Sequence, residues 1–198
     1  MSEDPQTAIV TLASLAPLPM WVAWQTQLRE KSDKRPTKIP YSPAGPDSRK
    51  ARADDPATWG DRTSAEARAS RLPKPFGTGG VGLEFTEIGD GTSIGGVDLD
   101  ACRDHASGDI EPWAMAVIDS LGSYAEVSPS QTGAKVFFRY AVADLPALRA
   151  AIGGTLDGKP RHGVFWKRPG KADHPPAIEL HLLAWCMDRA VVPRCRVT

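Results

Sequence analysis

The sequence lacks any apolar run near the roughly 20 residues that a helix needs to cross a bilayer. Its first 19 residues carry acidic side chains where a signal peptide would carry basic ones, so we expect neither an export signal nor a membrane partner. Excess charge is also missing, because 24 Lys and Arg residues balance 24 Asp and Glu residues. A basic surface for nucleic acid would therefore have to come from local clustering.

Cysteine is scarce, and the three cysteines, Cys102, Cys186 and Cys195, form no Cys-x-x-Cys pair. This pattern indicates a reduced, cytoplasmic protein without a disulfide framework or a zinc knuckle. The signatures GxxxxGK[ST], GxSxG and HExxH are absent too, and no Rossmann fingerprint follows a strand. The chemistry that these absences leave open is phosphoryl chemistry on a divalent metal ion.

At 198 residues the chain is long enough for one domain with a core or for two small lobes. The segment Met20–Gln25 is rich in Trp and Val, which predicts a short, mostly buried strand. The following basic segment carries four prolines, so we expect an extended connection with a brief edge strand at 38–41. A helix is then predicted to begin at Pro56, with Asp54 or Asp55 as its cap, and to include the Ala, Glu and Arg run at Ser64–Ser70.

The second half of the chain alternates strands and helices. Its Gly-rich start predicts a hairpin, with strands at Val81–Phe85 and Ile94–Leu99 around the turn GDGT. The later elements are a helix ending at Gly122, the strand pair YAEVSP and AKVFFRY, a helix at LPALRAAIGG, and the strands HGVFWKR and AIELHLLAW. The order ββαββαββ predicts an α+β fold, with mainly antiparallel sheets and flanking helices.

Two carboxylates, Asp98 and Asp100, end the apolar strand IGGVDLD. Side chains alternate along a strand, so both project to one face while Val97 and Leu99 pack into the core. Carboxylates this close repel each other unless a cation lies between them, and their hard oxygens suit Mg²⁺ or Mn²⁺. The alternative is a strand end at which both aspartates are solvated.

The segment SPSQTGAK provides a second candidate site. Ser128, Ser130, Thr132 and Gly133 form a loop of small residues whose backbone N–H groups could face an anion, with Lys135 emerging next to it. An ordinary hairpin turn followed by an exposed lysine is the alternative.

Two further candidates depend on their neighbours. Glu179 is the single carboxylate in the apolar strand AIEL, and it becomes a metal ligand only in company with the two aspartates. Trp166, Lys167 and Arg168 form a basic and aromatic patch that could stack a base and bind a phosphate, or could be a solvated hairpin end. The four histidines lack ligand spacing.

From about Trp21 to Glu179 the order of motifs resembles the primase–polymerase domain of the archaeo-eukaryotic primase superfamily, in its phage and plasmid replication form. WVAWQ, RPTKIPYSPAG and ADDPATW resemble its N-terminal block, GGVGLEFT and IGGVDLDAC its first catalytic motif, EVSPSQTGAKVFFR its second, and AIEL the start of its third. The resemblance implies an RRM-like catalytic half at 76–180 and a smaller N-terminal α/β lobe at 20–75.

The resemblance also implies roles for the candidates. Asp98, Asp100 and Glu179 would bind two Mg²⁺ or Mn²⁺ ions about 3.5–4 Å apart, which activate the primer hydroxyl. The loop residues named above and Lys135 would hold the triphosphate of the incoming nucleotide, and residues 166–168 would contact DNA. The implied partners are a single-stranded DNA template, nucleoside triphosphates and a replicative helicase domain or protein.

Two features depart from the family pattern. Relatives often have His at the position of Lys135, and lysine keeps a phosphate contact but not a neutral hydrogen bond. Residues 181–198 form an atypical C-terminal tail, so a shifted reading frame near residue 181 is one hypothesis. Two alternatives to an active enzyme follow: an inactive, truncated replication module that binds DNA or a helicase, and a small metal-dependent nuclease.

Overall fold

The computed structural model describes residues 9–29, 32–53, 55–151, 155–156, 159–160, 163–165 and 177–181. These residues fall into two units, Ala13–Phe85 and Thr86–Leu183, the second of which also includes the described residues before Ala13. A short helix, α1 (Leu12–Leu15), begins at the last residue before Ala13 and continues into the first unit. Each unit has its own antiparallel sheet.

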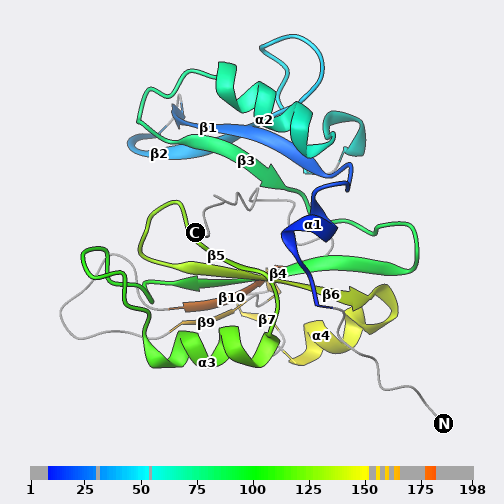
Figure 1. Ribbon diagram of the computed structural model, residues 1–198, viewed down its shortest axis with the longest axis vertical. Coiled ribbons are helices and arrows are strands. Elements are labelled where there is room, and N and C mark those ends of the chain that lie inside the picture. Colours follow the sequence, from blue (N-terminus) through cyan, green and yellow to red (C-terminus); the bar gives the residue numbers. More distant parts are fainter. Residues whose placement is uncertain are drawn as a thin grey trace. The chain divides into compact units, whose positions relative to one another are not determined.

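The first unit contains a three-stranded sheet in the order β2–β1–β3, drawn in blue to green in Figure 1. The strands are β1 (Trp21–Arg29), β2 (Ser32–Tyr41) and β3 (Gly79–Leu83). Helix α2 (Arg62–Arg71) packs Ala69 against Ala23 and Tyr41 on one face of this sheet. The predicted edge strand at 38–41 is present as the end of the longer β2, whose outer position tolerates prolines.

The predicted start of the helix in this unit is only partly correct. Asp55 is a helix cap and Pro56 is a first helical residue, but they begin a separate 3-10 helix, η1 (Pro56–Thr58), in which Asp55 accepts from the Ala57 N–H at 3.1 Å. Helix α2 has its own cap, Asp61, which accepts from the Ser64 N–H at 2.8 Å. The two helices are separate because Trp59 has extended backbone angles. Gly60 then forms a bridge with Trp21 of β1, which prevents a continuous helix.

The predicted hairpin between Val81–Phe85 and Ile94–Leu99 is wrong. Strand β3 pairs with β1, with Trp21 opposite Leu83, and does not pair with β4 (Thr92–Asp100). The turn itself forms, since the Ile88 N–H donates to the Thr92 carbonyl oxygen at 2.9 Å. The chain before this turn joins the first unit, so the turn connects two sheets and does not close a hairpin within one.

The second unit contains a five-stranded antiparallel sheet in the order β5–β6–β4–β10–β9. Its strands are β4, β5 (Ala125–Val127), β6 (Ala134–Ala141), β9 (Gly163–Phe165) and β10 (Ala177–His181). The remaining elements are α3 (Pro112–Leu121), η2 (Val142–Asp144), α4 (Leu145–Ala151), β7 (Thr155–Leu156) and β8 (Lys159–Pro160). The predicted pairing of YAEVSP with AKVFFRY is confirmed, and so is the α+β class.

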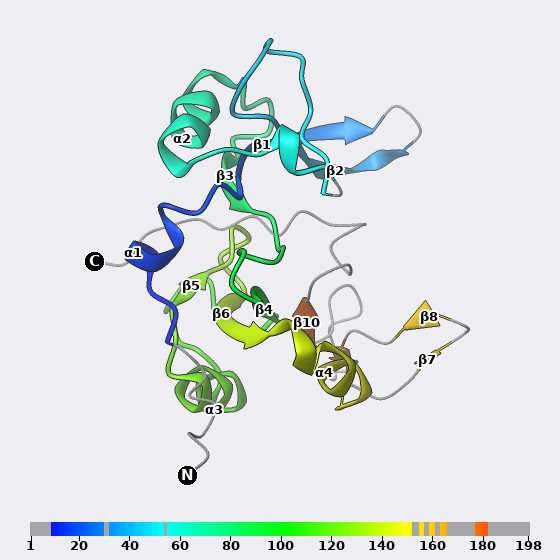
Figure 2. The ribbon, with the colours of Figure 1, turned by 90° about the vertical axis from the view of Figure 1, so that its right-hand side faces the viewer.

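Helices α3 and α4 lie on the same side of the five-stranded sheet (Figures 1 and 2). Trp113 and Val117 of α3 and Leu148 of α4 pack against the apolar side chains of that face. Helix α3 ends as predicted at Gly122, whose φ of +53° is a left-handed conformation that favours glycine.

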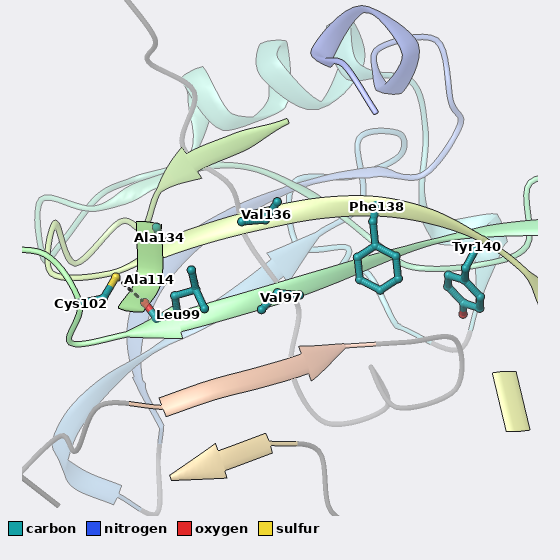
Figure 3. Close-up of a cluster of buried hydrophobic side chains, with 8 residues drawn as sticks. All are labelled: Val97, Leu99, Cys102, Ala114, Ala134, Val136, Phe138 and Tyr140. Atoms are coloured by element: carbon teal, nitrogen blue, oxygen red, sulfur yellow. Dashed lines mark hydrogen bonds between the residues drawn. The ribbon is translucent and has the colours of Figure 1, made fainter. Parts of the chain in front are cut away.

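Alternate residues of β4 and β6 form the core of this unit, which Figure 3 shows. Its buried members are Val97, Leu99, Cys102, Ala114, Ala134, Val136, Phe138 and Tyr140. Complete burial of one large apolar side chain stabilises a fold by about 1.5–3 kcal/mol. The Cys102 thiol donates to the Leu99 carbonyl oxygen at 3.3 Å, and burial raises the pKa of this thiol to about 11.

Candidate active site

The face of the five-stranded sheet opposite α3 and α4 carries a row of charged residues. Directly paired residues are Glu126 with Lys135, Lys135 with Asp98, and Asp98 with Glu179. Residues directly opposite each other in an antiparallel sheet share a face. Strands β5, β6 and β4 therefore place Glu126, Lys135 and Asp98 in a single line across the sheet, and the backbone of Glu179 on β10 lies at the next position of that line.

Asp98 is at the centre of this row and is ion-paired through Oδ2 with the Lys135 ammonium group. The side chain of Lys135 is only 6% exposed and that of Asp98 is 19% exposed, so water screens this pair weakly. The other carboxylate oxygen, Oδ1, is buried and accepts no hydrogen bond from the described residues. One oxygen of Asp98 thus remains available to a further positive group.

Asp100 is two residues farther along β4, opposite Ala177 of β10, and is half-buried. Successive residues on one face of a strand are roughly 6–7 Å apart, so Asp98 and Asp100 are neighbours on the charged face. Ala101 has a φ of +51°, and this left-handed residue ends the strand directly after the second carboxylate. The predicted projection of both aspartates to one face therefore holds in the register.

The loop between β5 and β6 presents a chain of hydroxyl groups. The Oγ of Ser130 lies 2.8 Å from the Oγ of Ser128 and 3.0 Å from the Oγ1 of Thr132. Ser128 is buried, whereas Ser130 and Thr132 are exposed. The exposed hydroxyls offer donors and acceptors at the end of the strand that carries Lys135.

The backbone of this loop is used differently from the prediction. The N–H groups of Gln131 and Gly133 donate to Ser128, at 2.9 Å to its carbonyl oxygen and at 3.1 Å to its Oγ. Those two groups therefore bind within the loop and not to an outside anion. Gly133 is needed for space, because a Cβ atom there would lie 2.6 Å from the Leu99 carbonyl oxygen.

Arg103 is a site residue that the sequence analysis missed. Its Nη1 donates to the Gln131 carbonyl oxygen at 2.8 Å, and its own N–H donates to the Thr132 carbonyl oxygen at 3.0 Å. It thereby ties the loop to the chain just beyond Asp100. The one sign in the sequence was its position three residues after Asp100, because a positive side chain so close along the chain can lie beside the carboxylates.

Glu126 was missed as well. It is 5% exposed and accepts a hydrogen bond from the Tyr124 hydroxyl at 3.1 Å. A glutamate between apolar residues in a short strand is usually on an open face, so its burial could not be predicted from the sequence. Its carboxylate places negative charge on the side of Lys135 opposite Asp98.

The remaining predicted residues are described only in part. The backbone of Glu179 lies opposite Asp98, while Trp166, Lys167 and Arg168 are outside the described residues. Within the described part of the chain, no three His, Cys, Asp or Glu side chains gather to hold a metal ion. The two described aspartates could thus supply two carboxylates, with Glu179 remaining a predicted third.

Comparison with known proteins supports the predicted resemblance. Over 128 residues the chain is 32% identical to a protein named DNA primase-polymerase from Nitratiruptor phage NrS-1. The match covers 65% of this chain and 16% of that relative, so the chain corresponds to a small part of the relative's length. No family model matches the chain. No helix in the described segments is long and apolar enough to span a membrane.

Proposed function

We propose that this relative of a DNA primase-polymerase catalyses nucleotidyl transfer onto a primer, directed by a single-stranded DNA template. The observation that carries the proposal is the charged row across the five-stranded sheet, with Asp98 and Asp100 on one face of its central strand. The hydroxyl-bearing loop leads into the strand that carries Lys135 of this row, which suits a site for a nucleoside triphosphate. The relative's name supports the same activity.

The residues present fit a divalent cation. Asp98 has a buried carboxylate oxygen that accepts no hydrogen bond from the described residues, and Asp100 adds a second hard oxygen donor on the same face. Mg²⁺ commonly takes only one or two protein carboxylates and completes its shell with water and substrate phosphates. Asp98 and Asp100, with Glu179, would hold Mg²⁺ or Mn²⁺. When bound, such ions activate the attacking hydroxyl and stabilise the leaving pyrophosphate.

The protein's own groups would bind and orient the triphosphate. The exposed hydroxyls of Ser130 and Thr132 would contact phosphate oxygens, and Arg103 fixes the loop that carries them by donating to the Gln131 carbonyl oxygen. A rigid loop places the reacting phosphate without a further loss of entropy at each turnover. Residues 166–168 are proposed to contact the template.

Because the chain spans 16% of the length of its relative, the wider context is also a proposal. We expect it to work in phage or plasmid replication in the cytoplasm, with template opening supplied by a helicase domain or protein. Pull-down of a replicative helicase by the full chain, with a single-stranded DNA-binding protein as the negative control, tests this association.

The direct test is primer extension and de novo priming on single-stranded DNA by the full chain, with Mg²⁺ or Mn²⁺. The variants are Asp98→Asn and Asp100→Asn, with Asp119→Asn on the exposed side of α3 as the matched control. We expect the control to form product at the wild-type rate and each site variant to form it roughly 10³-fold more slowly. A folded wild type that binds nucleotide or DNA yet yields no product would refute the proposal and favour the inactive replication module.

A further inference from the structure

Lys135 has an unusual position for a residue expected to contact a triphosphate. Its side chain is 6% exposed, and its ammonium group is already ion-paired with Asp98. In the register it stands between Glu126 on β5 and Asp98 on β4. The lysine thus lies between two carboxylates of the neighbouring strands.

This placement compensates the negative charge of the row. Asp98, Asp100 and Glu126 share one face of the sheet with a single lysine in the middle. Carboxylates that crowd one face repel each other unless a cation lies among them. Lys135 therefore supplies one positive charge among the carboxylates at which a divalent cation is proposed to bind.

The two oxygens of Asp98 are in different environments. Oδ2 is taken by the ammonium group of Lys135, whereas Oδ1 is buried and accepts no hydrogen bond from the described residues. A cation that binds Asp98 would bind a carboxylate whose negative charge is partly neutralised by Lys135. Its affinity is then lower than it would be at an unpaired carboxylate, because two positive charges would share one group.

We propose that Lys135 is a positioning residue that couples the metal ion to the nucleotide. In the nucleotide-free protein it holds Asp98 and weakens binding of the divalent ion. When a triphosphate binds beside the loop between β5 and β6, its phosphates attract the ammonium group of Lys135, and Asp98 becomes available to the metal ion. The inference rests on the proposed function and adds a dependence between the two ligands that the proposed function does not require.

The coupling has a defined sign. A ligand shifts an equilibrium only by its differential affinity for the two states, and here both ligands favour the state in which Lys135 has left Asp98. Each ligand must therefore raise the affinity of the other by the same factor. Removing the positive charge of Lys135 should raise metal affinity in the absence of nucleotide and reduce the factor by which nucleotide increases it.

The experiment measures Mn²⁺ binding to the full chain by electron paramagnetic resonance of free Mn²⁺. It compares samples without nucleotide and with a deoxynucleoside triphosphate analogue that has a non-hydrolysable α,β-methylene bridge. The variants are Lys135→Met and Lys135→Gln, and Lys50→Met in an exposed part of the first unit is the control. Lys135→Gln retains a hydrogen-bond donor, so it carries the test if Lys135→Met does not fold.

We expect both Lys135 variants to bind Mn²⁺ about tenfold more tightly than the wild type without nucleotide, within the range of measured couplings. The control should match the wild type. Equal or weaker Mn²⁺ binding by the Lys135 variants would overturn the inference while leaving the proposed function standing. Absence of Mn²⁺ binding by the wild type, with or without the analogue, would instead refute the metal site and the inference with it.

Discussion

Asp98 and Glu84 belong to different units, and their carboxylates differ in whether a positive group is paired with them. Asp98, on the central strand of the five-stranded sheet, is ion-paired with Lys135. Glu84, just beyond β3 in the first unit, is 1% exposed, and neither of its oxygens accepts a hydrogen bond from the described residues. Burial raises the pKa of Glu84 to about 7.

The contrast shows that burial and charge pairing act separately in this protein. At Glu84 the loss of water acts alone and favours the neutral acid. At Asp98 a cation supplied by the neighbouring strand faces the carboxylate, at a position where a metal ion is proposed to bind. Substitutions at each of the two carboxylates and at their neighbours should therefore have different effects.

The largest effect is expected from Asp98→Asn or Asp100→Asn, each of which removes one negative charge and keeps the side-chain shape. Nucleotidyl transfer should fall roughly 10³-fold, about 4 kcal/mol in the barrier, because the charge that holds the metal ion is lost. Single-turnover primer extension measures this loss, with circular dichroism to check folding. Retention of more than a tenth of the wild-type rate in either variant would contradict the assigned role.

The second effect concerns Glu84 and pH. A carboxyl group whose pKa is higher in the folded than in the unfolded state keeps its proton in the fold where the unfolded chain has lost it. The free energy of unfolding should therefore fall as pH rises from about 4.5 toward about 7, and then level off. The expected loss between pH 5 and pH 8 is about 3 kcal/mol at most.

Urea denaturation of the wild type and Glu84→Gln at several pH values measures this difference. The variant should lose the pH-dependent part of the stability, since an amide does not titrate in this range. Glu87→Gln, at an exposed position, should keep the wild-type profile. Parallel profiles for the wild type and Glu84→Gln would show that the carboxyl group of Glu84 is ionised equally in both states.

The third effect is the coupling between Asp98 and Lys135. Each single change, Asp98→Asn or Lys135→Met, leaves a buried polar partner behind, so the double variant should be more stable than the sum of the single effects predicts. We expect a coupling free energy of about 1–2 kcal/mol, since Asp98 retains some contact with water. Urea unfolding of the four proteins completes the cycle, and additive single effects would argue against a stabilising ion pair.

The smallest effect is expected at Gly133, which lets the loop approach β4 near the paired charges. In Gly133→Ala the new Cβ atom would lie 2.6 Å from the Leu99 carbonyl oxygen, so backbone must shift. The free energy of unfolding should fall by about 1–2 kcal/mol, as in other overpacked sites. A change below about 0.5 kcal/mol in thermal unfolding would mean that the loop moves away at little cost.

Local signals predicted much of the second unit. Alternation along Ile94–Asp100 placed Val97 and Leu99 in the core and the aspartates on the other face, and Gly122 marked the end of α3. These features depend only on residues close together in the chain, so they can be inferred from a single sequence. The predicted strand partner of 81–85 was wrong. A turn sequence at Asp90–Gly91 predicts a turn but does not identify the strand that pairs with 81–85, which is the distant β1.

The charges of the site were harder to predict. The pairing of Asp98 with Lys135 depends on a register between residues 37 positions apart, and the sequence alone had left Lys135 as a phosphate contact or an exposed lysine. The burial of Glu84 and Glu126 was also invisible, since polar residues in strands usually face water. Arg103 could be assigned only once its contact with the Gln131 carbonyl oxygen was seen.

Cys102 lies at the end of the strand that carries both aspartates, with its thiol against the Leu99 carbonyl oxygen and a pKa of about 11. At neutral pH such a sulfur is almost entirely unreactive while it remains covered. In a variant with Ser at positions 186 and 195, a soluble alkylating agent would therefore modify the protein only when this core opens. The rate at which the Cys102 adduct forms would then measure how often this core opens under native conditions, without denaturant.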